Sequence, residues 1–409
     1  MFPHEVPFSG WSGEHFISQL SRLHSIQCLI LPTGTFSVEH GGPGQIAKFH
    51  HLSKLTKLDA SSTYMNTSTC AELSALYDLR HLNLSDNLME MVVYTKDQAR
   101  PLLDDQLVIS LQHLTFLDMS NNNGLDGDTM IQFASCLPSL CHLDVGKCDG
   151  ILTLNSLIEL QPLTRMSHLG LRYAAFETDT IVHHMFSLTQ LSSLDLTHAS
   201  VGTHDALPLN FFHGLTHIQS LCIGHTLSAV NCVVLGQSLV KFPTITHLRL
   251  NNIYVMNSLH VCITNILKPL SLSHLATTLF SLDLSGNHVI LTQKHGNILT
   301  KFQRLTSLDI SHNHIHVHLW VSICTMRSLK QLRVRSSDVK DTHIHDLTRL
   351  TSLEELDVSN NRCIRVLSIL YVAKSLPLLK QVKVDMTMLP RTKCPIEECQ
   401  LIDLLHSRA

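Results

Sequence analysis

Apolar residues recur along this chain in one fixed spacing. The copy that begins at Leu305 shows it well, because Leu308, Ile310 and Ile315 are apolar while Asn313 stands between the last two. Apolar residues at alternate positions are typical of a short strand with one buried face. The asparagine and the apolar residue after it indicate a turn and a returning segment. Each copy therefore predicts a strand, a turn and a return.

The pattern starts at fourteen places, and most neighbouring starts are 24 to 27 residues apart. A single copy cannot bury its own leucines, so neighbouring copies must stack into one continuous core. The copies start at Ile26, Leu55, Leu79, Leu114, Leu140, Met166, Leu191, Ile218, Ile245, Leu279, Leu305, Leu329, Leu353 and Leu379.

The spacing L-x-x-L-x-L-x-x-N-x-L resembles the leucine-rich repeat superfamily. A period in the mid-twenties leaves room for a helical return, and Met130, Phe133, Ala134 and Leu137 share one helix face. The segment 70–76 behaves similarly. The chain is thus most similar to the ribonuclease-inhibitor-like and mixed intracellular classes of that superfamily.

The resemblance implies an α/β solenoid of horseshoe form. Its concave side would be a parallel sheet, and its convex side would carry helical or irregular returns. We expect residues 1–25 to form an N-terminal cap, residues 26–388 the solenoid of about fourteen repeats, and residues 389–409 a C-terminal cap.

The ninth position of the repeat holds asparagine in five copies. A buried amide there can satisfy backbone groups of the turn. The asparagines are Asn87, Asn122, Asn287, Asn313 and Asn361. Other residues fill the slot in the middle of the chain, so we expect less regular turns between residues 145 and 255. Two copies are longer than the rest, and we expect their extra residues, 92–105 and 268–278, in loops.

Charge and cysteine usage bear on partners and compartment. A formal net charge of -3 gives no global argument for nucleic acid, and no apolar run approaches the roughly 18 residues of a membrane span. The N-terminus lacks the pattern of a signal peptide. The twelve cysteines are scattered without a C-x-x-C spacing. We therefore expect free thiols, a cytoplasmic location, no nucleic-acid partner and no membrane insertion.

No catalytic constellation is evident in the sequence. Phosphate-binding, dinucleotide-binding, zinc-protease and nucleophile-elbow motifs are all missing. The run His312, His314, His316 and His318 invites a metal interpretation, but no cysteine or carboxylate stands beside it at ligand spacing. We expect no catalytic, cofactor or metal site.

The third, fifth, seventh and eighth positions of each copy should face solvent. The fifth position is mostly acidic. These residues either reflect the usual consensus of such repeats or attract a basic partner. Between Leu140 and Ile245 the exposed positions change character and gather aromatic, histidine and arginine side chains, which are typical of contact sites. We expect a locally basic patch that binds a protein partner through His142, His168, Arg172, Tyr173, His198, His225, His247 and Arg249.

The function that follows is a non-catalytic scaffold or adaptor that binds a protein partner on its concave face. Two alternatives stay open. One is the substrate-recognition subunit of a ubiquitin ligase, for which no docking motif is evident. The other is a secreted or cell-surface ligand-binding domain, which predicts paired cysteines.

Overall fold

The computed structural model describes residues 24–31, 33–34, 49–65, 72–87, 105–122, 125–148, 151–152, 158–176, 188–201, 215–225, 232–253 and 259–384. The chain divides into two compact units, residues 1–204 and 205–409. We call them unit 1 and unit 2, and describe each by itself. Nearly all of the expected N-terminal cap and the whole C-terminal cap lie outside the described residues, so the cap boundaries stay predictions.

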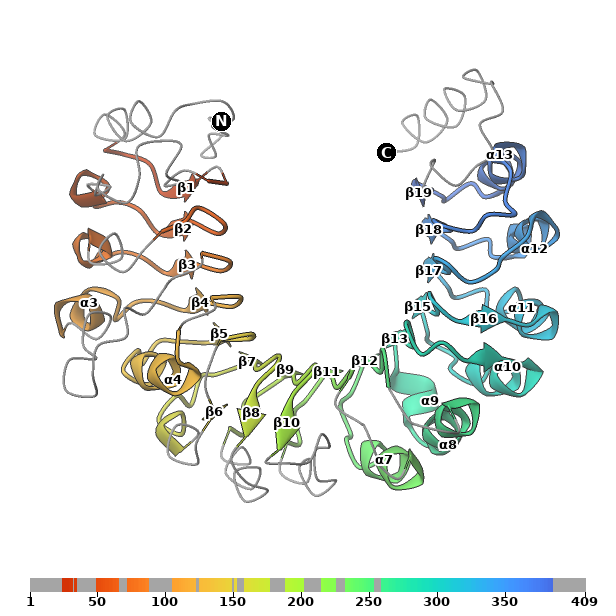
Figure 1. The fold of residues 1–409 in the computed structure, drawn as a ribbon, viewed down its shortest axis with the longest axis horizontal. Helices are drawn as coiled ribbons and strands as arrows, with labels where there is room; N and C mark the ends of the chain where they lie inside the picture. The colour runs from red at the N-terminus through yellow and green to blue at the C-terminus, as the bar shows by residue number, and fades with distance from the viewer. Residues whose placement is uncertain are drawn as a thin grey trace. The chain divides into compact units, whose positions relative to one another are not determined.

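The strands of unit 1 lie side by side in chain order and are all parallel (Figure 1). They are β1 (Cys28–Ile30), β2 (Lys57–Asp59), β3 (His81–Asn83), β4 (Phe116–Asp118), β5 (His142–Asp144), β7 (His168–Gly170) and β9 (Ser193–Asp195). Each strand pairs with the next so that the middle leucines align, as Leu143 does with Leu169.

Unit 2 repeats this arrangement. Its strands also pair in parallel, with Leu282 opposite Leu308 and Leu308 opposite Leu332. They are β11 (Ser220–Cys222), β12 (His247–Arg249), β13 (Ser281–Asp283), β15 (Ser307–Asp309), β17 (Gln331–Arg333), β18 (Glu355–Asp357) and β19 (Gln381–Lys383).

The predicted register of the strands is confirmed. The middle residue of a typical strand, such as Leu143 or Leu308, is buried, while the residues on either side of it are only half-buried. The buried leucines contact the layer behind the sheet, and their neighbours face solvent. One face of the sheet is thus committed to the core and the other is available to partners.

The returning segments of unit 1 change character along the chain. The early ones contain η2 (Phe49–His51), η3 (Glu72–Ala75), α3 (Asp105–Ser110) and α4 (Gly127–Ser135). The predicted helical return after Leu125 is confirmed as α4, whose first turn is capped because the backbone N–H of Thr129 donates to the carboxylate of Asp126 at 3.0 Å. Later returns form two-residue strands, β6 (Ile151–Leu152), β8 (Ala175–Phe176) and β10 (Ser200–Val201). Of these three strands, β8 lies in the middle and pairs in parallel with β6 and with β10.

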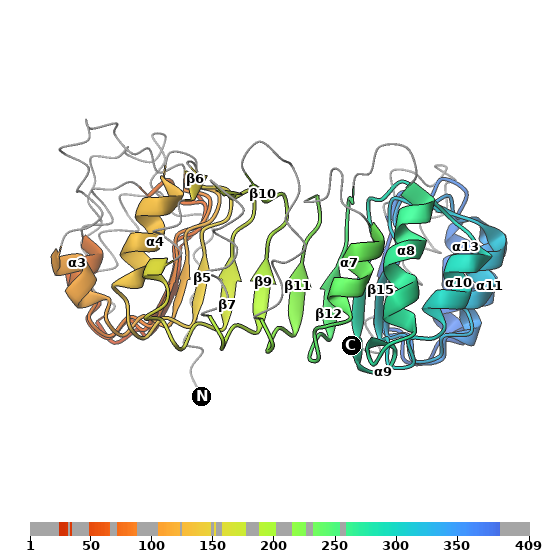
Figure 2. The same cartoon turned by 90° about the horizontal axis from the view of Figure 1, so that it is seen from below.

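The returns of unit 2 are mainly helical, and α7, α8 and α10 run alongside the strands (Figure 2). The elements are α7 (Cys232–Leu239), α8 (Leu259–Ser271), α9 (Leu275–Thr278), β14 (Ile290–Leu291), α10 (Gln293–Leu299), β16 (His314–Ile315), α11 (Val317–Ile323), α12 (Asp341–Asp346), η6 (Leu347–Arg349) and α13 (Val366–Ser375). The expected loop at 268–278 is wrong, because most of these residues extend α8 and form α9. The other long insertion, 92–105, lies almost wholly outside the described residues.

The buried asparagines behave as the sequence predicted. Asn361 donates from Nδ2 to the carbonyls of Val334 and Val358, both at 2.8 Å. Its Oδ1 accepts from the backbone N–H groups of Ser337 and Val339, both at 3.0 Å. Each such amide therefore connects the turn of its own repeat to the turn of the preceding one.

The expectation of less regular turns in the middle of the chain is wrong at the eighth residue of the repeat. From Ser62 to Asn360 this residue has a left-handed backbone in every described turn, including those of Lys147, Tyr173, His198 and His225. Only the side chain differs from repeat to repeat. The turn geometry is set by stacking on neighbouring repeats, since the N–H of Tyr173 donates to the carbonyl of Thr197 at 2.9 Å.

These features confirm an α/β leucine-rich repeat solenoid in each unit. Within the described parts of the chain, no helix is long and apolar enough to cross a membrane.

Candidate partner-binding face

The structure distributes the eight predicted site residues over both units. In unit 1, strands β5 and β7 carry His142 and His168, and the turns that follow β7 and β9 carry Arg172, Tyr173 and His198. Unit 2 holds the other three, His225, His247 and Arg249. We therefore treat two separate groups on the exposed sheet faces.

In unit 1 the third position of four neighbouring strands holds a ring, and these rings stack. We call His81, Phe116, His142 and His168 the ring ladder. The successive centroid separations are 3.9, 4.1 and 3.9 Å, with interplanar angles of 16°, 13° and 4°. Parallel strands are about 4.8 Å apart, so flat side chains at equivalent positions can reach stacking distance by leaning slightly. The rings thus form one ordered surface across β3, β4, β5 and β7.

The histidines of this group are neutral near pH 7. Burial, together with smaller contributions from the neighbouring His168 and His81, lowers the pKa of His142 to about 3. Burial is also the main reason that the pKa values of His81 and His168 are lowered. The pKa values of His198 and His247 shift in the same direction. The expectation of a basic patch is therefore wrong for four of its histidines, His142, His168, His198 and His247.

The ring ladder predicts that unit 1 loses stability in mild acid. Below the ordinary histidine pKa of 6.5, the unfolded chain takes up protons that folded His142 does not bind until pH approaches 3. Stability is therefore fully present above 6.5 and is lost as pH falls through this window. Between about pH 7.5 and about pH 5, we expect the free energy of unfolding to fall by roughly 1–2 kcal/mol, after allowance for solvent screening. Urea unfolding at the two pH values measures this.

His142→Phe is the matched variant, because Phe116 already occupies the same ladder one strand away. It should keep the stack and reduce the difference between the two pH values. The raised pKa of Asp144, caused by its burial, acts in the opposite sense in stronger acid. For that reason the comparison stops at about pH 5. An unchanged pH dependence in His142→Phe would assign the acid sensitivity to other groups.

Next to the ring ladder, two glycines make room for an ion pair. A guanidinium nitrogen of Arg172 lies 3.4 Å from the carboxylate of Asp144. A Cβ on Gly170 would lie 2.5 Å from Cγ of Asp144, and one on Gly146 would lie 2.9 Å from Cβ of Arg172. The Nε of Arg172 is buried and has no hydrogen-bond acceptor among the described residues. The fifth position of the repeat is mostly acidic, but Gly170 occupies it in this copy. The close packing against Asp144 explains why a residue without a side chain stands there.

Gly170→Ala tests that explanation. The added methyl group would have to displace the Asp144 carboxylate, so we expect a loss of about 1–3 kcal/mol in unfolding free energy, as for other overpacking changes. Thermal and urea melts measure it. Asp144→Ala in the same background removes the obstacle and should recover part of the loss, whereas no recovery would contradict the steric account.

A second ring pair stands at the turns. Tyr173 and His198 stack at 4.2 Å between centroids with an interplanar angle of 11°. Both occupy the left-handed eighth position, with φ of 61° and 62°, which bulky side chains adopt only at a cost. The Tyr173 residue is 50% exposed. A large aromatic residue in a strained position is not required by the repeat, because serine, asparagine and lysine serve there in other copies.

The three predicted site residues of unit 2 lie on, or in the turn after, two neighbouring strands. His247 and Arg249 are exposed on β12, and His225 is exposed in the turn after β11. Charged side chains dominate farther along the sheet. There, Arg333 lies 3.8 Å from Glu355, and Glu354 lies between Lys330 and Lys380 at 3.0 and 3.2 Å. These two lysines lower the pKa of Glu354.

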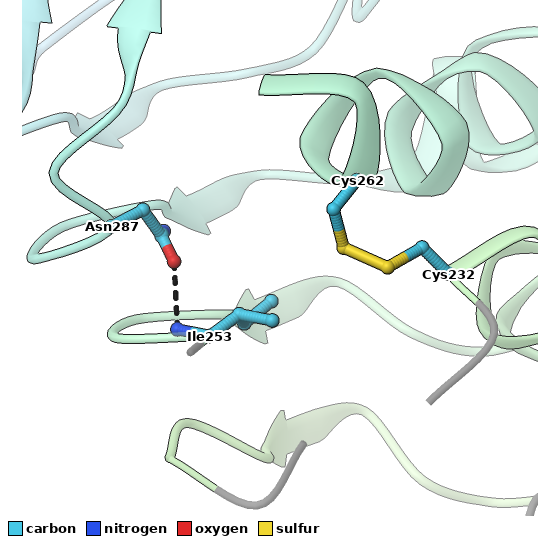
Figure 3. The surroundings of a disulfide bond; sticks show 4 residues. All are labelled: Cys232, Ile253, Cys262 and Asn287. Atoms are coloured by element: carbon cyan, nitrogen blue, oxygen red, sulfur yellow. Dashed lines mark hydrogen bonds between the residues drawn. A yellow bond between two sulfur atoms is a disulfide. The ribbon is translucent and has the colours of Figure 1, made fainter. Parts of the chain in front are cut away.

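A disulfide joins two return helices of unit 2. Cys232 at the start of α7 is bonded to Cys262 in α8, with Cα atoms 5.3 Å apart, and the bond lies behind the repeat turn in which Ile253 donates to Asn287 (Figure 3). The expectation of free thiols is therefore wrong for this pair. Among the described cysteines, Cys136, Cys141, Cys324 and Cys363 are free. No local sequence pattern indicated this pair, because the two cysteines are 30 residues apart.

The histidine run that invited a metal interpretation is mostly exposed. His314 and His316 flank buried Ile315, as predicted, and His314 contacts Asp338 at 2.7 Å. Among the residues that the structure describes, no group of three or more histidine, cysteine, aspartate or glutamate side chains could hold a metal ion.

Comparisons with known proteins concern the repeat fold. No model of a protein family matches the chain. Toll-like receptor 9 of Bos taurus is 29% identical over 145 residues, which make up 34% of this chain and only 12% of the receptor.

Three solved structures are similar at low identity. They are an internalin of Listeria monocytogenes (TM-score 0.47, 18% identity, covering 82% of this chain and 81% of that one), a TLR13–ssRNA13 complex (0.46, 17%, 89% and 55%) and a leucine-rich repeat protein of Leptospira interrogans (0.40, 17%, 90% and 98%). The class of the chain, a leucine-rich repeat protein, rests on its own period, strand register and asparagine-linked turns.

Proposed function

We propose that this chain is a non-catalytic interaction protein that binds a protein partner on the exposed face of its sheet, as a scaffold or adaptor. The observation that carries the proposal is the aromatic surface of unit 1, formed by the ring ladder and the stacked pair Tyr173 and His198. Stacked rings on adjacent strands lose little conformational freedom when a partner binds. Aromatic and arginine side chains also dominate the energy of most protein interfaces.

The subset of the predicted site that belongs to unit 1 supports this proposal best. His142, His168, Arg172, Tyr173 and His198 come from consecutive repeats of one sheet. Core packing requires none of them, because the leucines of the same strands fill the interior. The neutral imidazoles make this surface aromatic and polar, and its acidic neighbours favour a partner with positive charge.

Partner capture with a double variant tests the proposal. In the combination of Arg172→Ala with Tyr173→Asn, asparagine tolerates the left-handed turn. Loss of the ion pair with Asp144 should lower the melting temperature somewhat but leave the chain folded. Partner binding should weaken by about 1–3 kcal/mol if the two side chains are anchors. Quantitative affinity capture of the full chain from cell extract, followed by mass spectrometry and a direct titration of the captured protein, measures the effect.

The matched control reverses charge at Asp309 and Asp357 in unit 2. We expect these changes to matter less for the same partner. If a partner still binds the first variant but no longer binds the charge-reversal variant, the binding site lies at the acidic side chains of unit 2 instead.

The compartment is a separate proposal. A cytoplasmic location requires that Cys232 and Cys262 be reduced in the cell, whereas a disulfide favours an oxidising compartment. The disulfide is thus the specific observation in favour of the second candidate function, a secreted or cell-surface ligand-binding domain. A ubiquitin-ligase subunit has no such observation in its favour.

Thiol mapping decides between these two. Protein purified from its native source is alkylated without reductant, digested and analysed for the peptide pair that carries Cys232 and Cys262. A linked pair, with exposed Cys136 alkylated in the same sample, supports the secreted or cell-surface role. Alkylation of all three cysteines supports the cytoplasmic adaptor. Buried Cys324, whose pKa is raised to about 12, should react only after unfolding.

A further inference from the structure

The ring ladder stops at β9. The residue of β9 that pairs with His168 is Ser193, whose side chain carries no ring. His168 stacks on His142 through one face, and it makes no second ring contact within the described residues. We call the position at Ser193, next to the face of His168 that stacks on no ring, the open step.

At the opposite end of the ladder the chain supplies a cation of its own. Lys57 on β2 pairs in register with His81, the first ring. Its charge is close enough to contribute to the lowered pKa of His81. The two ends of the ladder therefore differ, because a positive side chain stands beside the first ring and only a hydroxyl beside the last.

A carboxylate borders the open step. Asp195 follows Ser193 by two residues and faces the same side of the sheet. Its Oδ1 accepts from the backbone N–H of Thr197 at 2.9 Å and from the Thr197 hydroxyl at 2.6 Å. Its Oδ2 takes no hydrogen bond from any described residue. The register partner of Asp195 is Gly170, which has no side chain to cover the carboxylate.

The charges that face this position leave it attractive to a cation. Burial keeps His168 neutral, so its ring does not repel positive charge. The positive charge of Arg172 acts on His168, and it is partly offset by Asp144 at 3.4 Å. Asp195 and Asp118 both act on His168 in the opposite sense to Arg172. A flat cation could contact the ring face of His168 and the carboxylate of Asp195, which lie on adjacent strands.

We propose that the open step binds the guanidinium group of an arginine side chain on a protein partner, stacked on His168 and paired with Asp195. A guanidinium is planar, always charged and able to stack and donate hydrogen bonds at the same time. An ammonium group offers charge and hydrogen-bond donors but no flat face, and a neutral ring offers only the flat face. The inference rests on the proposed function and names the partner chemistry that unit 1 recognises.

Three labelled peptides test the chemistry. Each has a single central side chain among glycines and serines: arginine in the first, lysine in the second and citrulline, which is flat but uncharged, in the third. Fluorescence anisotropy titration of the full chain gives the dissociation constants. We expect the arginine peptide to bind roughly fivefold or more tighter than either of the others. Equal affinities for all three, or no binding of the arginine peptide at millimolar concentration, would overturn the proposal.

Two variants test whether the arginine side chain binds at the open step. Ser193→Phe should fill the open step with a ring of the chain's own, and Asp195→Asn should remove the charge while keeping an acceptor for Thr197. Each should weaken the arginine peptide by about tenfold. The matched controls are Ser307→Phe and Asp309→Asn in β15, which has the same Ser-Leu-Asp sequence but pairs with Ser281 instead of a ring. Equal losses in both strands would reduce the effect to general electrostatics and overturn the assignment.

The outcomes separate this proposal from the broader one. If the double variant Arg172→Ala with Tyr173→Asn no longer binds the natural partner but Ser193→Phe still binds it, the face does bind a partner. The assignment of an arginine to the open step is then wrong. If no partner depends on either variant while the arginine peptide still requires Ser193 and Asp195, the open step is real and the proposed function of the face is wrong.

Discussion

Replacing Leu308 with alanine should lower the free energy of unfolding by roughly 2–5 kcal/mol, the usual cost of a large-to-small change in a packed core. Leu308 is 0% exposed and lies between Leu282 and Leu332 on the neighbouring strands. Removing its methyl groups leaves a void that the adjacent repeats cannot close, because their own strands hold them in register. Urea or guanidinium unfolding, followed by circular dichroism, measures the loss.

Ser307→Ala is the control for Leu308→Ala, since the two residues are adjacent on β15 but point to opposite faces. We expect it to cost under about 0.5 kcal/mol, as for most surface substitutions. Equal losses from the two changes would mean that the assignment of faces on β15 is wrong.

The fold could be predicted because its causes are local and repeated. A leucine at alternate positions specifies which face of a three-residue strand is buried, and fourteen copies fix the register. The asparagine slots followed from the need to satisfy turn carbonyls and N–H groups. The loop expected at 268–278 failed for a physical reason, because the extra residues extend a helix that already packs on α7.

The repeat positions predicted which side chains share the exposed face, but not their chemistry, and their use by a partner stays a prediction. Equivalent positions in the repeat place His142 and His168 on the same face of the sheet. The sequence cannot show that their rings stack with centroids 3.9 Å apart. Burial lowers the pKa of both imidazoles, so the positive charge expected from them is missing near pH 7. Phe116 and His81 occupy the same repeat position as His142 and His168, and only the geometry joins them to the site.

The disulfide escaped prediction because its two cysteines lie in return helices. Strand positions repeat strictly, but the returns vary in length and type, so alignment of Cys232 with Cys262 depends on how α7 packs on α8. The same reason explains why the boundary between helical and strand-like returns in unit 1 could not be derived from spacing alone.

Replacing Asn361 with alanine should be as damaging as losing a core leucine. The amide is 4% exposed and makes two donor and two acceptor hydrogen bonds to backbone groups of adjacent turns. Alanine would leave two buried N–H groups and two carbonyls without that partner, and each buried polar group left unpaired costs about 1–3 kcal/mol. Partial relaxation of the turn recovers some of this, so we expect a net loss of roughly 3–5 kcal/mol in urea unfolding.

Asn361→Ser is the informative companion variant, because serine already fills the same slot at Ser337. There the hydroxyl donates to the carbonyls of Arg335 and Ile310 at 2.9 and 3.3 Å. Serine at position 361 should therefore restore part of the donor function while leaving the N–H groups of Ser337 and Val339 unpaired. Hydrogen exchange should show faster exchange of these two amides in both variants. If they stayed as protected as in the unaltered chain, the asparagine would not be what holds neighbouring turns together.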